Sequence, residues 1–172
     1  ESLASHRELT RARLFEALGS LMGEQSFESI TMSQIAERAG VGRTAVYNHF
    51  ADKEVLLLAY MREVTSEFAR VLKQRLEAEP DPLMRLRIYI RSHLQMIGRY
   101  HVKAGMGLRR HMSGQGASHL HDHAGVVGEV LIGILDEAME RGLIAQQNTL
   151  GAVHLIHATL QGQRLPQDPE HR

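Results

Sequence analysis

Two cationic side chains near the beginnings of predicted helices have the chemistry to bind nucleic acid. Arg43 stands in the first turn of a short predicted helix, where a guanidinium can donate two hydrogen bonds to O6 and N7 of a guanine. Lys53 begins a longer predicted helix and adds its ammonium to the positive end of the helix dipole, which is typical of a phosphate site. No nucleophile paired with a general base is visible, so the pattern indicates binding rather than catalysis.

Hydroxyl groups extend this pattern at the beginning of the preceding predicted helix. Thr31 and Ser33 stand at its first turn, where side chains commonly contact phosphate. Thr31 and Gln34 also have the spacing of a capping box, in which the threonine hydroxyl accepts from the backbone N–H of Gln34 and the glutamine side chain reaches back. The sequence therefore predicts a helix that begins directly after Thr31.

A histidine-rich stretch offers a second candidate chemistry, because imidazoles at short spacing can share a metal ion. The candidate ligands are His111, His119, His121, Asp122 and His123. Gly116 and Gly125 flank the segment, and no second carboxylate cluster accompanies it. We therefore expect neither a metal nor another cofactor, and a metal-dependent enzyme remains only as an alternative.

Composition narrows the class of protein. The 172 residues carry 20 Lys and Arg against 20 Asp and Glu, so overall charge does not point to DNA. There is no cysteine, no export signal, and no apolar run near the roughly 20 residues that a membrane span needs. We expect a cytoplasmic protein with no membrane partner. Charge is uneven, because residues 81–115 hold seven Lys and Arg against Asp81 alone.

Apolar residues recur at helical spacing and strand-like alternation is absent, so the fold is predicted to be all-α. A first helix over residues 7–22 precedes two short helices over 31–39 and 42–50, which meet at Gly40. Asp52 caps the next helix, which continues to residue 78. Two short helices joined by a tight glycine turn form a helix-turn-helix, whose second helix enters the major groove of DNA.

The rest of the chain is also predicted to be helical. The predicted helices cover residues 83–99, 126–142 and 148–162. Residues 101–125 are rich in glycine and histidine, and we predict only a short helix and a loop there.

The helix-turn-helix segment closely resembles the TetR family of bacterial transcription regulators. The resemblance rests on TMSQIAERAGV at residues 31–41, AVYNHF at 45–50 and DKEVL at 52–56. It extends over the first 60 residues, whereas the body matches only in its number of helices and in ERGLI at 140–144.

The resemblance implies roles for the second short helix. Thr44 and Asn48 are implied to contact base edges or phosphates, and the rings of Tyr47 and His49 are implied to donate to phosphate. Ala45 departs from the family, which commonly has a hydroxyl residue there, and its methyl group can contact a thymine methyl.

The resemblance also implies two domains and about nine helices in all. Residues 1–52 would form a three-helix DNA-binding domain, and residues 53–172 a body that binds a small-molecule effector and dimerises. Soft or aromatic side chains with polar tips suit a mostly apolar pocket, although each can equally be an ordinary core residue. The candidate effector-binding residues are Met61, Phe68, Tyr89, His93, Met96, Tyr100, Met106 and Arg109.

Two apolar helix faces near the end of the chain resemble the family's four-helix dimer interface. The predicted interface residues are Val126, Val127, Val130, Ile134, Val153, Ile156, His157 and Leu160. A two-fold dimer presents two recognition helices to the DNA, so the predicted operator is palindromic.

The sequence therefore predicts a TetR-type regulator that is not an enzyme, most simply a repressor that binds its operator as a homodimer and is released by a small-molecule effector. One alternative is a ligand-independent architectural or nucleoid protein with the same helix-turn-helix. The other is the metal-dependent enzyme that would use His119, His121 and His123.

Overall fold

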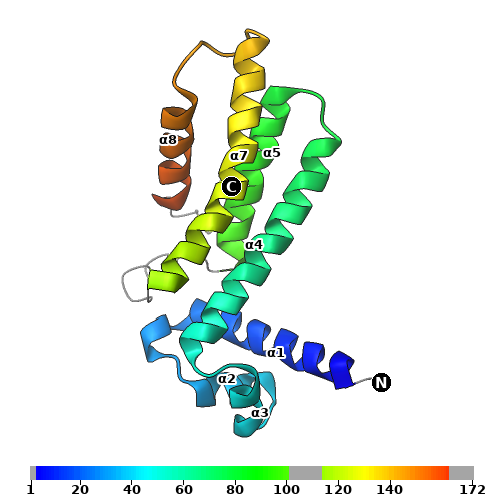
Figure 1. The fold of residues 1–172 in the computed structure, drawn as a ribbon, viewed down its shortest axis with the longest axis vertical. Coiled ribbons are helices and arrows are strands. Elements are labelled where there is room, and N and C mark those ends of the chain that lie inside the picture. Colours follow the sequence, from blue (N-terminus) through cyan, green and yellow to red (C-terminus); the bar gives the residue numbers. More distant parts are fainter. Residues whose placement is uncertain (1–2, 101–113, 163–172) are drawn as a thin grey trace. The chain divides into compact units, whose positions relative to one another are not determined.

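The computed structural model describes residues 3–100 and 114–162, and within them the chain is helical, with no strand. Figure 1 shows the order of the elements, which confirms the all-α prediction. The elements are α1 (Leu3–Glu24), the 3-10 helix η1 (Phe27–Ser29), α2 (Met32–Ala39), α3 (Arg43–His49), α4 (Lys53–Glu77), α5 (Pro82–Tyr100), α7 (Gly114–Glu140) and α8 (Thr149–Gly162). The described part thus has seven α-helices, and the expected nine is not matched.

The helix α7 begins earlier than the sequence suggested. The sequence predicts only a short helix and a loop over residues 101–125, but α7 already begins at Gly114 and passes through Gly116 and Gly125. A glycine inside a helix costs only about 1 kcal/mol relative to alanine, and it ends a helix where it adopts a left-handed conformation. Among the described glycines, only Gly40 and Gly142 have positive φ.

Of the described residues, 3–64, 100 and 114–117 form one compact unit, here called unit 1, and 65–99 and 118–162 form unit 2. The boundary between the units lies inside α4, so it differs from the division at residue 52 that the sequence suggested, which stays a prediction. No helix among the described residues is long and apolar enough to cross a membrane.

Unit 1 is built around the side of α1 that carries Leu14 and Leu18, both fully buried. Ile35 of α2 and Val46 of α3 are equally inaccessible, and so is Leu56 of α4. Each of the short helices therefore contributes to one shared core, which fixes their mutual orientation.

Unit 2 is a helical bundle whose core draws on four helices. Its buried members are Phe68 and Leu72 of α4, Tyr89 of α5, Val127, Leu131, Ile134 and Leu135 of α7, and Val153 and Leu160 of α8. Figure 1 shows α4, α5 and α7 side by side in this region.

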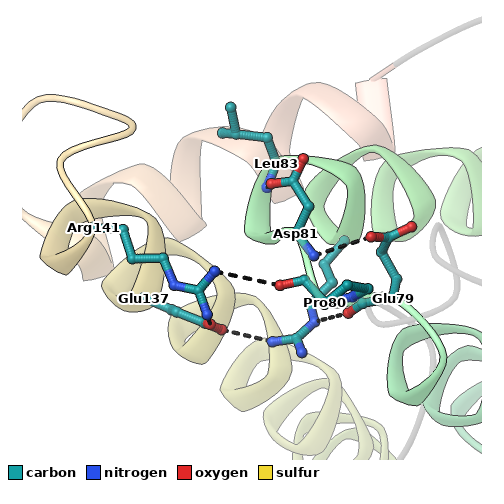
Figure 2. Close-up of polar contacts among 7 residues, drawn as sticks. Glu79, Pro80, Asp81, Leu83, Glu137 and Arg141 are labelled. Atoms are coloured by element: carbon teal, nitrogen blue, oxygen red, sulfur yellow. Dashed lines mark hydrogen bonds and ion pairs between the residues drawn. The ribbon is translucent and has the colours of Figure 1, made fainter.

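Charged side chains fix the turn between α4 and α5 to the end of α7, as Figure 2 shows. Arg85 donates to Glu137 at 2.6 Å and to the backbone oxygen of Glu79 at 2.5 Å. Arg141 pairs with the other oxygen of Glu137 at 2.5 Å and approaches the carbonyl oxygen of Pro80. Glu137 therefore holds two guanidinium groups at once.

We expect Glu137→Gln to lower the free energy of unfolding by about 1–2 kcal/mol, because two guanidinium groups lose a charged acceptor. Chemical denaturation measures the change. The control is Glu77→Gln, whose partner Lys73 lies 3.8 Å away in a largely exposed pair, and which should cost less than about 0.5 kcal/mol. Equal losses in the two variants would show that the Glu137 cluster adds no more than a surface pair.

Candidate DNA-binding surface and effector-binding residues

The helix α2 begins at the predicted capping box. Oγ1 of Thr31 accepts from the backbone N–H of Gln34 at 3.2 Å, and Oε1 of Gln34 accepts from the backbone N–H of Thr31 at 2.8 Å. The threonine hydroxyl also lies 3.0 Å from Oε1 of Gln34. Both Thr31 and Ser33 are exposed, and their proposed contact with phosphate stays a prediction.

The turn between α2 and α3 also has the predicted form. Gly40 adopts a left-handed conformation with φ of 64° and ψ of 35°, and its N–H donates back to α2. Val41 donates to the carbonyl oxygen of Ala36 at 3.0 Å, which closes the turn. Gly42 then precedes α3 and supplies no side-chain cap.

Packing divides α3 into two faces. Val46 is fully buried, and Phe50, directly after the helix, is 6% exposed. The polar candidates share the opposite face, where Arg43, Thr44, Tyr47 and Asn48 are exposed and Ala45 is half-buried at the edge. The structure therefore brings the predicted base-reading residues together on one accessible surface.

His49 lies at the border of this surface. It is half-buried, and its ring centroid lies 6.3 Å from that of Phe50. Burial, together with the positive charges of Arg7 and Arg11, lowers the pKa of His49. The ring is therefore neutral at pH 7 and still has one N–H to donate to a phosphate.

Two arginines of α1 were missed by the sequence analysis. Arg11 lies over the rings of Phe15 and Phe50, with its guanidinium carbon 5.1 Å and 6.0 Å from their centroids. Arg7 lies one turn earlier in α1, and its positive charge, like that of Arg11, lowers the pKa of His49. Their spacing of four residues, followed by Phe15 after four more, is the signal that indicates one common face of α1.

The ammonium group of Lys53 points inward rather than into open solvent. It donates to the backbone carbonyl oxygens of Phe27, Glu28 and Ile30 at 3.1, 2.9 and 3.0 Å. It also lies 4.8 Å from the centroid of the Phe27 ring. Its contact with phosphate stays a prediction, and such a contact would have to form beside these bonds or in place of them.

An open hollow of about 500 Å³ lies in unit 1, beside α1 and α2. Its lining residues are Leu21, Glu24, Gln25, Gln34, Glu37 and Arg38. Arg38 forms two hydrogen bonds with Glu24, at 2.7 and 2.8 Å, which lower the pKa of that carboxyl group. The lining is polar, and none of the predicted effector residues belongs to it.

Three of the predicted effector residues meet in the core of unit 2. The ring of His93 lies 4.4 Å from that of Tyr89 and 4.7 Å from that of Phe68, centroid to centroid. The hydroxyl of Tyr89 donates to the carbonyl oxygen of Val127 at 3.1 Å and lies 2.7 Å from Nε2 of His157. We call Phe68, Tyr89, His93 and His157 the aromatic cluster.

The protonation of the aromatic cluster follows from its burial. Burial lowers the pKa of His93 to about 4 and also lowers the pKa of His157, whereas it raises the pKa of Tyr89. Nδ1 of His93 lies 3.2 Å from the carbonyl oxygen of Tyr89, which can only accept, so Nδ1 carries the proton. Nε2 of His93 is therefore a hydrogen-bond acceptor.

The other predicted effector residues do not join the aromatic cluster. Met61 is buried in unit 1, and Met96 is half-buried at the edge of the unit 2 core. Tyr100 ends α5, and its side chain is outside the described part of the structure, as are Met106 and Arg109 altogether. The backbone of the three clustered histidines, 119, 121 and 123, is helical in α7, and their side chains are also outside the described part.

Several residues predicted to form the dimer interface instead pack within the chain's own helical bundle. The side chains buried in the core of unit 2 are those of Val127, Ile134, Val153 and Leu160. Val130, Ile156 and His157 are half-buried, and the side chain of Val126 lies outside the described part. The large exposed apolar side chains of α8 are instead Leu150 and Leu155, at 60% and 70% exposed. The sequence showed two wide apolar faces but could not show which side of α8 faces its own core.

Comparison with known proteins identifies the N-terminal helices. A family model described as "Bacterial regulatory proteins, tetR family" matches residues 14–60. The HTH-type transcriptional regulator BetI of Klebsiella pneumoniae is 37% identical over 73 residues, which are 42% of this chain and 37% of that protein. The matched region thus spans less than half the length of the curated relatives.

Solved structures share the fold over most of the chain. FadR from Bacillus subtilis, in complex with stearoyl-CoA, has a TM-score of 0.75 and 20% identity over 87% of this chain and 82% of its own. AibR, in complex with isovaleryl coenzyme A and operator DNA, has a TM-score of 0.78 and 19% identity over 95% and 90%. Over residues 14–60 the chain thus matches the tetR family of bacterial regulatory proteins, and over most of its length it shares the fold of these solved structures.

Proposed function

We propose that this chain is a transcription repressor that binds a palindromic operator as a homodimer and releases it when a small molecule binds. The observation that carries the proposal is the exposed polar face of α3, held in place by the buried Val46 and Phe50. The protein acts on DNA in the cytoplasm and catalyses no reaction in this proposal.

The exposed face of α3 supports a division of labour in DNA recognition. Arg43 is accessible at the first turn and suits a guanine edge. Thr44 and Asn48, four residues apart, suit base edges or nearby phosphates, while Tyr47 and the neutral ring of His49 suit phosphate. Thr31 and Ser33, exposed at the beginning of α2, suit the phosphates that flank the groove.

Arg43→Ala tests this assignment. We expect the variant to lose its preference at one base pair of each half-site, because a bidentate contact to guanine discriminates by about 1–3 kcal/mol. Selection of bound duplexes from a random-sequence pool, followed by sequencing, measures the preference.

The matched control is Arg62→Ala, which removes an exposed arginine from α4 and should leave the selected sequence unchanged. An unaltered preference in Arg43→Ala would refute the assignment. If the unmodified chain selects sequences that share no common site, the architectural alternative is favoured instead.

The effector is proposed to be a coenzyme A thioester. Two solved structures with the same fold hold such ligands, stearoyl-CoA and isovaleryl coenzyme A. In this chain, the core of unit 2 is apolar around the aromatic cluster, which suits an acyl chain, and Nε2 of His93 can accept from a polar group. Arg87 and Arg91 are exposed on α5, and their positive charges suit the phosphates of coenzyme A.

Thermal unfolding tests the class of effector. At a concentration 100 times its Kd, a ligand that binds only the folded chain stabilises it by about 2.7 kcal/mol, which corresponds to a rise in Tm of several degrees. We expect such a rise with stearoyl-CoA or isovaleryl-CoA and none with coenzyme A alone. Tyr89→Phe should reduce the rise, whereas Tyr47→Phe, on the exposed face of α3, should not. A chain that binds DNA but shows no shift with either thioester has an effector of another class.

The dimer is proposed to form through the exposed side of α8. Leu150 and Leu155 are exposed there, with His154 and Ala158 on the same side. Gly151 of α8 and Gly133 of α7 are also exposed, and small residues allow helices to approach closely. Two copies that face each other in this way would bury four large leucine side chains.

Leu155→Glu is expected to shift the chain from dimer to monomer, because it places a charge at the centre of an apolar contact. Sedimentation velocity measures the mass, and operator affinity should fall by more than 10-fold because the two half-sites are no longer linked. The control is Leu83→Glu, since Leu83 is an exposed leucine at the beginning of α5. An unchanged dimer in Leu155→Glu would place the interface elsewhere.

A further inference from the structure

The hydrogen bonds of Lys53 account for its whole capacity to donate. A lysine ammonium has three N–H groups and no acceptor. The three carbonyl oxygens of Phe27, Glu28 and Ile30 lie 2.9–3.1 Å from Nζ, and the Phe27 ring closes another side at 4.8 Å. No N–H is left for a phosphate oxygen unless one of these bonds breaks.

The beginning of α4 is likewise already occupied. Oδ1 of Asp52 accepts from the backbone N–H groups of Glu54 and Val55, at 2.9 and 2.8 Å. These are amides of the first turn, which would otherwise face an anion. The carboxylate of Asp52 therefore takes the place that a phosphate would need, and it also repels phosphate by its charge.

The position of Lys53 along the chain gives its bonds a geometric meaning. Ile30 immediately precedes Thr31, the cap of α2, and Lys53 follows Asp52 at the end of the connection from α3. The bond from Nζ of Lys53 to the carbonyl oxygen of Ile30, at 3.0 Å, thus joins the two ends of residues 31–52. This one side chain therefore links the two ends of the helix-turn-helix segment.

We propose that Lys53 is a positioning residue, which holds the helix-turn-helix at a fixed angle to α4 through three backbone carbonyls and makes no phosphate contact. The inference rests on the proposed function, because it concerns how the helix-turn-helix is presented to an operator. A fixed orientation of the helix-turn-helix matters most for specific binding, in which α3 must enter the groove in one orientation. Non-specific binding depends on phosphate charge and tolerates a less fixed orientation of the helix-turn-helix.

The first test uses Lys53→Met, which keeps the aliphatic stem and removes the ammonium. The probes are a duplex selected from a random-sequence pool by the unmodified chain, and a duplex of unrelated sequence. We expect affinity for the selected duplex to fall about 10-fold to 100-fold at every salt concentration, because the charged hydrogen bonds that orient the helix-turn-helix are lost. Affinity for the unrelated duplex and the slope of log K against log salt should stay unchanged.

A phosphate contact gives the opposite pattern. Its loss would weaken binding to both duplexes and reduce the salt slope by about 0.9 for each contact, and that result would overturn the proposal. Equal affinity of Lys53→Met and the unmodified chain for both duplexes would also overturn it, because it would leave Lys53 with a role in stability alone. The control is Lys73→Met, which removes an exposed lysine of α4 in unit 2.

Two further measurements cover the case in which Lys53→Met fails to fold. Lys53→Arg keeps the charge but cannot place three N–H groups on the same three carbonyls, so we expect it to lose specific affinity, whereas a phosphate contact would tolerate arginine. In the unmodified chain, the ¹⁵N NMR signal of the Lys53 ammonium should be visible and should not move on addition of the selected duplex. Retained affinity in Lys53→Arg, or a shifted signal, would contradict the proposal. If the unmodified chain selects no duplex, the proposed function fails instead.

Discussion

The shortness of α3 is the constraint on which the DNA-binding surface depends. A helix of seven residues is not stable alone in water, because too few hydrogen bonds follow its costly first turn. Its stability must come from Val46, which is fully buried, and from Phe50, whose ring centroid lies 5.9 Å from that of Phe15 in α1. Every polar group that α3 offers to DNA is therefore held in place by apolar contacts on the opposite side of the same two turns.

The features that sequence predicted well are those with local physical causes. The capping box joins Thr31 to Gln34, the turn depends on the conformation of Gly40, and Asp52 caps α4 through residues two and three positions ahead. Each of these interactions lies within a few residues, so the residue types alone determine it. The same holds for the buried and exposed faces of α3, which follow from the spacing of its apolar residues.

The features that sequence missed depend on partners far along the chain. Lys53 donates to carbonyls 23 to 26 residues away, and backbone oxygens leave no trace in the pattern of residue types. Residues Val153 and Leu160 looked suited to a partner chain, but they are buried in the chain's own bundle. Hydrophobicity shows that a side chain avoids water, and only the arrangement of the other helices decides where it is buried.

On the proposed mechanism, α8 has two roles that its two sides keep separate. One side carries His157, whose Nε2 lies 2.7 Å from the hydroxyl of Tyr89 in the core. The other side carries Leu155, which is 70% exposed and faces the proposed partner. A ligand that replaces the bond between Tyr89 and His157 would act directly on the helix that forms the dimer. Since a helix moves largely as one body, a change on its core side also displaces its exposed side.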